Sequence, residues 1–141
     1  MPIGELFVGP RVDPHNEHVL AHGEVITGIA VPACDDAVSV FLKARERTAW
    51  DFALASVSAV VSRDSAGTVT RAKVVLGGVA PNAWVARGAA DALVGRPLDE
   101  SAIRDAAEGA VAGARALRAN AYKIDLARNV VAEALRSIAT G

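Results

Sequence analysis

The residues best suited to chemistry lie in one polar stretch, residues 43–51, between two apolar runs. Its charged and aromatic members are Lys43, Arg45, Glu46, Arg47, Trp50 and Asp51. Cations beside an indole can hold an anionic or aromatic group through charge and stacking. Composition alone favours a simpler interpretation, in which the arginines and Glu46 pair off in a solvated loop. The residue types therefore leave two possibilities, a binding loop or a solvated turn.

Three histidines, His15, His18 and His22, form a second group. Neutral imidazoles three and four residues apart share a face of a helix and can ligate zinc. Pro14 and Gly23 bracket the segment, however, and no Cys or carboxylate cluster elsewhere obviously completes such a site. We therefore expect solvated loop histidines and no metal site.

Gly77 and Gly78 end an apolar run and could let backbone amides approach a ligand. No GxGxxG or P-loop pattern accompanies them, and no serine lies in a Gly-x-Ser-x-Gly elbow. We expect a tight strand-to-helix turn at the two glycines, and the sequence assigns no catalytic residue.

Alternating apolar residues predict the strands that must position these groups. Four segments qualify, residues 24–31, 37–44, 52–63 and 68–78. A period of two, rather than 3.6, favours half-buried strands over helices. The connection at residues 64–67 is short, so the last two strands should form a hairpin in an antiparallel sheet.

After Pro81 the apolar residues recur every three or four positions, which predicts helices. We expect a short helix over residues 84–93, a second helix capped by Asp99 and a third capped by Asn120. The apolar stripe of the second helix is Ile103, Ala107, Ala110, Ala114 and Leu117. The apolar stripe of the third helix is Ile124, Ala127, Val131, Ala134, Leu135 and Ile138.

Strands followed by helices indicate an α+β fold, with a small antiparallel β-sheet packed against a C-terminal helical bundle. Glycine and proline residues punctuate the opening of the chain. Residues 1–22 are therefore expected to form an N-terminal loop segment with one helical turn near residues 5–8. Residues 23–141 should form the domain.

The chain carries 15 basic and 16 acidic residues, for a formal charge of -1. Its overall field therefore gives no attraction to nucleic acid or to an anionic membrane surface. We find no secretory signal and no apolar run long enough to span a membrane. The single cysteine, Cys34, cannot form an internal disulfide. These features lead us to expect a cytoplasmic protein.

The polar stretch, KARERTAWDFA, resembles a loop in the FAD-binding subunits of the xanthine dehydrogenase and carbon monoxide dehydrogenase family, the molybdenum hydroxylases. The pattern of that loop is roughly K-x-R-x-R-x-x-x-D-F-A. GEVITGIAVP before it is similar to a strand of the family, and LGGVAPNAWVARGAADALVGRPL and NAYKIDLARNVVAEAL after it are similar to later segments. The four segments follow the family order and cover most of residues 23–137.

The resemblance implies the C-terminal domain of a flavin subunit, which completes the FAD site and docks a molybdenum-cofactor subunit and an iron-sulfur subunit. In that family electrons pass from molybdenum through iron-sulfur clusters to FAD and an acceptor. By resemblance, the residues that line or support the flavin are Lys43, Arg45, Arg47, Trp50 and Asp51.

The family's larger N-terminal portion, with its Gly-rich pyrophosphate loops, is expected to be missing from this chain. We therefore expect the chain alone neither to retain FAD nor to catalyse a reaction. The competing hypothesis is a stand-alone interaction module without redox activity, which would form homodimers through exposed sheet edges.

Overall fold

The computed structural model describes residues 1–34 and 36–141, which divide into two compact units, residues 1–35 and residues 36–141. Within its described residues, 1–34, the first unit contains one short helix, α1 (Ile3–Leu6), and a single bridge between Phe7 and His18. Backbone hydrogen bonds from Val8 to Glu17 and from Val19 to Leu6 hold these parts together. The expected helical turn is thus present, two residues earlier than predicted.

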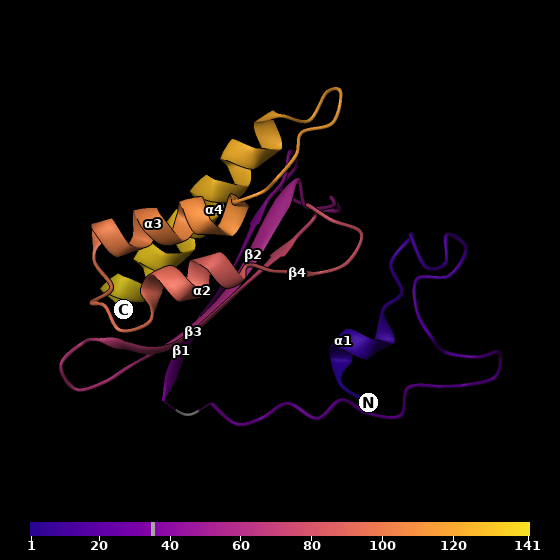
Figure 1. Ribbon diagram of the computed structural model, residues 1–141, viewed down its shortest axis with the longest axis horizontal. Helices are drawn as coiled ribbons and strands as arrows, with labels where there is room; N and C mark the ends of the chain where they lie inside the picture. The colour runs from indigo at the N-terminus through magenta and orange to yellow at the C-terminus, as the bar shows by residue number, and fades with distance from the viewer. Residues whose placement is uncertain (35) are drawn as a thin grey trace. The chain divides into compact units, whose positions relative to one another are not determined.

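The predicted strand at residues 24–31 is wrong for this chain. The segment belongs to the first unit and is drawn with neither helix nor arrow in Figure 1. It pairs with no other strand within the described residues. Alternation of apolar residues reports which faces of a segment are suited to burial, but a strand forms only where a neighbouring edge accepts its backbone hydrogen bonds.

The second unit is built on a four-stranded antiparallel sheet in the order β1-β2-β3-β4. The strands are β1 (Ala37–Ala44), β2 (Ala55–Arg63), β3 (Val69–Gly77) and β4 (Trp84–Val85). The first three confirm the predicted strands, although β2 begins three residues later than expected. The predicted hairpin joins β2 to β3, and its turn is held by the Asp64 carboxylate, which accepts the N–H groups of Ala66 and Thr68 at 2.9 Å each.

Three helices, α2 (Arg87–Leu93), α3 (Glu100–Val111) and α4 (Tyr122–Thr140), lie over one face of this sheet (Figure 1). This arrangement confirms the α+β fold and the packing of the sheet against C-terminal helices. Asp99 caps α3 as predicted, because its carboxylate accepts the N–H of Ala102 at 2.8 Å. No helix within the described residues is long and apolar enough to cross a membrane.

Three details of the helix predictions are wrong. Residues Trp84 and Val85 pair with β3 instead of starting a helix, because an aromatic and a β-branched residue suit the open edge of that strand. Helix α3 ends at Val111, so Ala114 and Leu117 lie beyond it and are exposed.

Asn120 does not cap α4. Its side-chain oxygen accepts the N–H of Leu117 at 2.6 Å and so closes a turn inside the preceding loop. The N-cap position of the helix is taken by Ala121, without a side-chain hydrogen bond.

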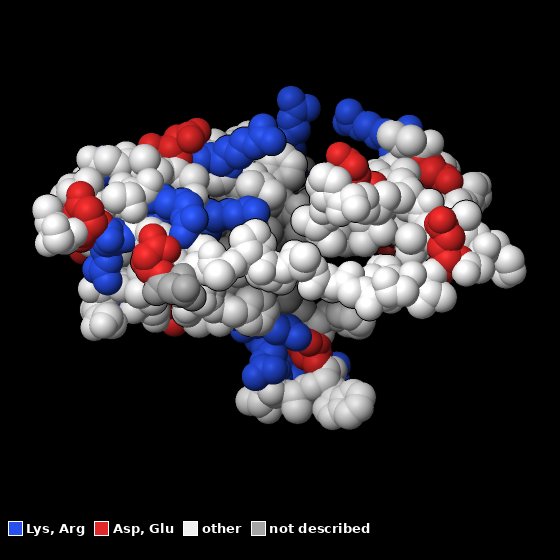
Figure 2. Space-filling model, turned by 90° about the horizontal axis from the view of Figure 1, so that it is seen from below, with Lys and Arg blue, Asp and Glu red and all other residues white. Residues whose placement is uncertain are grey.

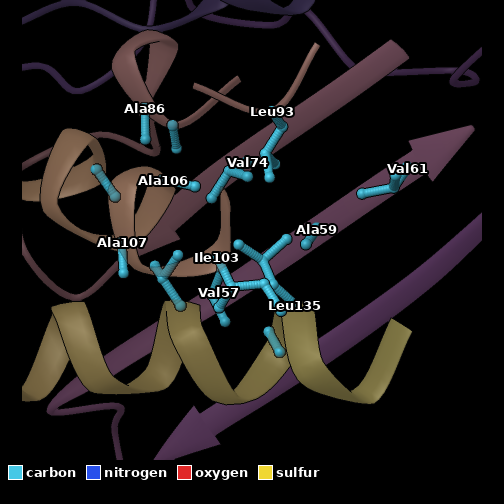
Figure 3. Packing of buried hydrophobic residues seen from close by; sticks show 14 of the residues in the cluster. Val57, Ala59, Val61, Val74, Ala86, Leu93, Ile103, Ala106, Ala107 and Leu135 are labelled. Atoms are coloured by element: carbon cyan, nitrogen blue, oxygen red, sulfur yellow. The ribbon is translucent and has the colours of Figure 1, made fainter. Parts of the chain in front are cut away.

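The core lies between the helix-covered face of the sheet and the helices (Figure 3). Val57 and Val74 from the strands point toward Ile103 of α3 and Leu135 of α4 in this view. Most of the predicted α4 stripe is buried, and Val130 joins it while Ile124 is only partly buried. Since many of the remaining core residues are alanines, helices and sheet can approach closely.

Helices α2 and α3 approach each other closely at two glycines, Gly88 of α2 and Gly109 of α3. A Cβ atom added to Gly109 would lie 2.5 Å from the carbonyl oxygen of Gly88, and one added to Gly88 would lie 2.8 Å from that of Gly109. Both obstacles are backbone atoms, so they cannot move aside by changing a rotamer.

We predict that Gly109→Ala destabilises the protein. In an ordinary helix this change stabilises by about 0.5–1 kcal/mol, but here the overpacking should reverse the sign and cost about 1–3 kcal/mol. Urea unfolding followed by circular dichroism measures the difference. Ser137→Ala, at an exposed position of α4, is the control and should change stability by less than about 0.5 kcal/mol. A Gly109→Ala variant at least as stable as the parent would contradict the proposed contact.

Candidate functional site

The polar stretch forms a hairpin loop, residues 45–54, that connects β1 to β2 at one end of the sheet. Its base is closed by the last residue pair of the two strands, Ala44 and Ala55, and by the N–H of Leu54, which donates to the carbonyl of Ala44 at 2.9 Å. The loop therefore begins and ends on two strands of the folded core, which fixes its position.

The Asp51 side chain organises this loop from within. Its carboxylate accepts the backbone N–H groups of Glu46 and Arg47 at 3.1 and 3.0 Å. The guanidinium of Arg47 also lies 3.7 Å from the second carboxylate oxygen. The Asp51 side chain is only 19 % exposed. An acidic side chain that satisfies loop amides replaces the missing strand partners and gives the loop a defined conformation.

Lys43 ties the base of the loop to its far side. Its ammonium donates to the backbone carbonyl of Asp51 at 2.6 Å. An ammonium has three protons, and this bond uses one of them without neutralising the charge. The exposed Lys43 side chain therefore holds a positive charge at a fixed place, with donors left for a ligand.

Trp50 and Phe52 flank Asp51 in the sequence, and their side chains are 99 % and 95 % exposed. Trp50 is also the non-glycine residue with a positive φ, 53°, in the described chain. For a bulky residue this conformation is strained, and such strain concentrates at active sites and ligand clamps. The loop thus exposes two aromatic rings on a backbone whose conformation is held by hydrogen bonds to the Asp51 carboxylate.

Gly78 supports the loop from the end of β3. Its φ is +73°, and an added Cβ would lie 2.8 Å from the carbonyl oxygen of Ala53. The ammonium of Lys123, at the start of α4, donates to the carbonyl of Gly78 at 2.7 Å. The two glycines therefore end β3 and let the loop backbone lie directly against it. The next element after this turn is strand β4 and not a helix, so the predicted strand-to-helix turn is wrong.

The structure brings three of the five predicted site residues into contact, Lys43, Arg47 and Asp51. Arg45 and Trp50 lie on the same loop with exposed side chains. The sequence did not point to Lys123, because no local pattern links it to a glycine 45 positions away.

A cavity of about 260 Å³ lies on the helix side of β3 and β4, and Lys123 is part of its wall. Most of the lining is apolar, with Leu76, Trp84 and Ile124 among its members. Lys123 therefore both lines this cavity and donates to the carbonyl of Gly78.

The three histidines lie exposed in the first unit. No group of three His, Cys, Asp or Glu residues that could hold a metal ion occurs within residues 1–34 and 36–141. On the face shown in Figure 2, side chains of both signs occur, Lys and Arg in blue and Asp and Glu in red.

Comparison with known families gives a match over residues 40–138 to the CO dehydrogenase flavoprotein C-terminal domain. The matched region contains the loop of residues 45–54, the β2–β3 hairpin, and α2 and α3.

Two relatives are similar in sequence. The aldehyde oxidoreductase FAD-binding subunit PaoB of Escherichia coli (strain K12) is 31 % identical over 133 residues, which are 94 % of this chain and 38 % of the relative. The carbon monoxide dehydrogenase medium chain of Hydrogenophaga pseudoflava is 33 % identical over 123 residues, 84 % of this chain and 42 % of the relative. The chain thus spans about two fifths of the length of these curated relatives.

Solved structures agree with this result. Quinoline 2-oxidoreductase from Pseudomonas putida 86 superposes with a TM-score of 0.69 and 30 % identity, over 80 % of this chain and 39 % of the other. Carbon monoxide dehydrogenase from Hydrogenophaga pseudoflava, in a form that lacks the Mo-pyranopterin moiety, superposes with a TM-score of 0.68 and 29 % identity, over 75 % of this chain and 38 % of the other.

We predict that Asp51→Ala loosens the loop without unfolding the domain. The amides of Glu46 and Arg47 lose their acceptor, and their hydrogen exchange should accelerate about fivefold, given about 1 kcal/mol per net hydrogen bond. Thr48→Ala, an exposed change in the same loop, is the control and should leave these amides unaffected. Equal exchange rates in the parent and in Asp51→Ala would show that the carboxylate does not order the loop.

We also predict that Gly78→Ala costs more stability than Gly113→Ala. Both glycines have a positive φ, but a Cβ at Gly113 would meet nothing within 4 Å. The two variants share the conformational cost, so their difference isolates the close approach of the loop and should exceed about 1 kcal/mol. Denaturant unfolding of both variants gives this difference, and a value near zero would argue against the backbone contact.

Proposed function

Because this chain belongs to the family of CO dehydrogenase flavoprotein C-terminal domains, we propose that it serves in the FAD-binding subunit of a molybdenum hydroxylase. Its proposed role is to complete the FAD site with the loop of residues 45–54. The observation that carries this proposal is the Lys43–Asp51 contact, which fixes a positive charge beside two exposed aromatic rings.

The side chains of the loop suit the flavin part of the cofactor. An isoalloxazine ring is flat and carries carbonyl oxygens and ring nitrogens, so its recognition needs hydrogen-bond donors and apolar surface. Lys43 offers donors, and Trp50 offers a planar surface. The FAD supplies the redox chemistry when it is bound. The part of this chain is to stabilise negative charge on the ring through Lys43, with Arg45 and Arg47 adding to the local positive field.

Binding of the remainder of FAD must come from elsewhere. The sequence contains no Gly-rich phosphate motif, and a pyrophosphate needs several converging backbone amides or basic side chains. We therefore propose that the chain alone neither holds FAD tightly nor catalyses a reaction. The pyrophosphate would be held by the N-terminal part of such a subunit.

The proposed partners follow from the names of the relatives, one a medium chain and one an FAD-binding subunit. We propose that the domain docks against a molybdenum-cofactor subunit and an iron-sulfur subunit. In this arrangement electrons would pass from molybdenum through iron-sulfur clusters to FAD and then to an acceptor.

A second candidate function is a stand-alone homodimerisation module. It is favoured by β1, which lies at an edge of the sheet and exposes the large apolar side chains of Val38 and Phe41. Light scattering of the purified chain between 5 and 200 µM, concentrations on the order of typical weak-dimer constants, separates the two candidates. A stable dimer would favour the module.

The flavin proposal is tested by titrating FAD into the chain, with and without the N-terminal part of the Escherichia coli PaoB subunit. We expect tight binding only when both parts are present. Lys43→Met should weaken it about tenfold, as expected for the loss of a charge-assisted hydrogen bond.

Lys73→Met is the matched control, because Lys73 is an exposed lysine of β3 outside the loop. It should leave the FAD affinity unchanged. Tight FAD binding by the chain alone would contradict the proposed incompleteness. Equal affinities for the parent and Lys43→Met would remove Lys43 from the site.

A further inference from the structure

The cavity on the helix side of β3 and β4 is a second place where the domain could hold a ligand. Its volume is about 260 Å³, and none of the described residues that line it belongs to the loop of residues 45–54. Cavities that hold drug-sized molecules measure about 300–1,000 Å³. This cavity therefore suits a smaller molecule, and its occupant would not compete with a group bound at the loop.

The inner wall of the cavity is apolar and belongs to the folded core. Leu76 of β3, Ala110 of α3 and Ala127 of α4 line it, and each is no more than 3 % exposed. Trp84 of β4 adds an indole ring that is 53 % exposed. A ligand with an apolar body could cover this surface without breaking a hydrogen bond of the protein.

The connection between α3 and α4 forms another wall, and its own hydrogen bonds order it. Residues 112–116 and Asn120 of this connection line the cavity. The N–H of Ala114 donates to the carbonyl of Val111 at 2.9 Å, and the N–H of Leu117 donates to the side-chain oxygen of Asn120 at 2.6 Å. Because the wall is already formed, a ligand would bear little of the cost of ordering it.

The charged residues of the lining are both cations, Arg115 and Lys123, and none of the described lining residues is acidic. Neither cation takes part in an ion pair within residues 1–34 and 36–141. Lys123 uses one of its three protons on the carbonyl of Gly78, at 2.7 Å. Two arginines of α4, Arg128 and Arg136, are by contrast paired with carboxylates. The cavity thus joins apolar surface to positive charge that is not neutralised, which is complementary to an apolar anion.

We propose that this cavity binds a small apolar carboxylate, such as an acid with one aromatic ring. The carboxylate accepts hydrogen bonds from Arg115 and Lys123, and the apolar body lies against Leu76 and Trp84. A carboxylate suits the cavity better than a phosphate, because a phosphate dianion needs several converging donors and two cationic side chains are available here. The site goes beyond the proposed flavin role and does not depend on it.

An NMR titration of the ¹⁵N-labelled whole chain with 3-phenylpropionate tests the proposal. For a ligand of this size we expect a Kd on the order of 1 mM. The amide resonances that shift should be those of the lining, with Gly113, Ala114 and Ile124 among them. The neutral 3-phenylpropionamide keeps the ring but lacks the charge, and it should bind at least about fivefold more weakly.

Two variants test the proposed donors. Arg115→Met and Lys123→Met should each weaken 3-phenylpropionate binding about fivefold, as expected for the loss of a charge-assisted hydrogen bond. Arg118→Met is the matched control, because Arg118 is an exposed arginine of the same connection that does not line the cavity, and it should leave the affinity unchanged. Lys123→Met also removes the bond to Gly78, so Arg115→Met decides the matter if that variant does not fold.

Three results would overturn the proposal. Equal binding of the acid and the amide would reduce the cavity to an apolar surface without a preference for charge. Shifts confined to residues outside the lining, or no binding at all, would exclude the site. Loss of binding when the N-terminal part of the Escherichia coli PaoB subunit is added, or when the chain is concentrated, would mean that protein covers the cavity. Because no FAD takes part in the titration, failure here is distinguishable from failure of the flavin proposal.

Discussion

The candidate site depends on one close approach at the end of β3. The backbone of Ala53 and Leu54 lies so near Gly78 that no side chain fits there, and the positive φ of Gly78 independently requires glycine. Lys123 binds the carbonyl of the same residue from the start of α4. Sheet, loop and last helix therefore meet at one position. Since backbone atoms meet backbone atoms, the contact cannot relax by a change of rotamer, and it gives the loop the rigid support that a binding site needs.

The parts of the fold that the sequence predicted correctly are those decided by neighbouring residues. Asp64 and Gly67 specify a tight turn within a few positions, and the β2–β3 hairpin follows from it. Asp99 caps α3 because an N-cap carboxylate needs only the amides of the next turn. The internal contacts of the loop are equally short in range, since Lys43, Arg47 and Asp51 lie within nine positions of one another. Residue types alone left two interpretations of this stretch, and the family resemblance selected these three together with Arg45 and Trp50.

Other features were missed because they depend on a tertiary partner that no local pattern identifies. Trp84 and Val85 have a helical context, but the open edge of β3 offers them backbone hydrogen bonds. Lys123 lies in an ordinary helix start, and only the tertiary fold places it at Gly78. The alternating pattern of residues 24–31 is a genuine strand pattern, yet no local signal states where the pairing edge is. Propensity specifies what a segment can become, and the available partner decides whether it does.

The second unit buries its alternating residues in its own core, and its most exposed aromatic rings, Trp50 and Phe52, lie on the loop. The Asp51 carboxylate accepts the amides of Glu46 and Arg47, so these rings stand on a backbone that is already ordered. A ligand that covered the rings would therefore not bear the entropic cost of ordering the loop.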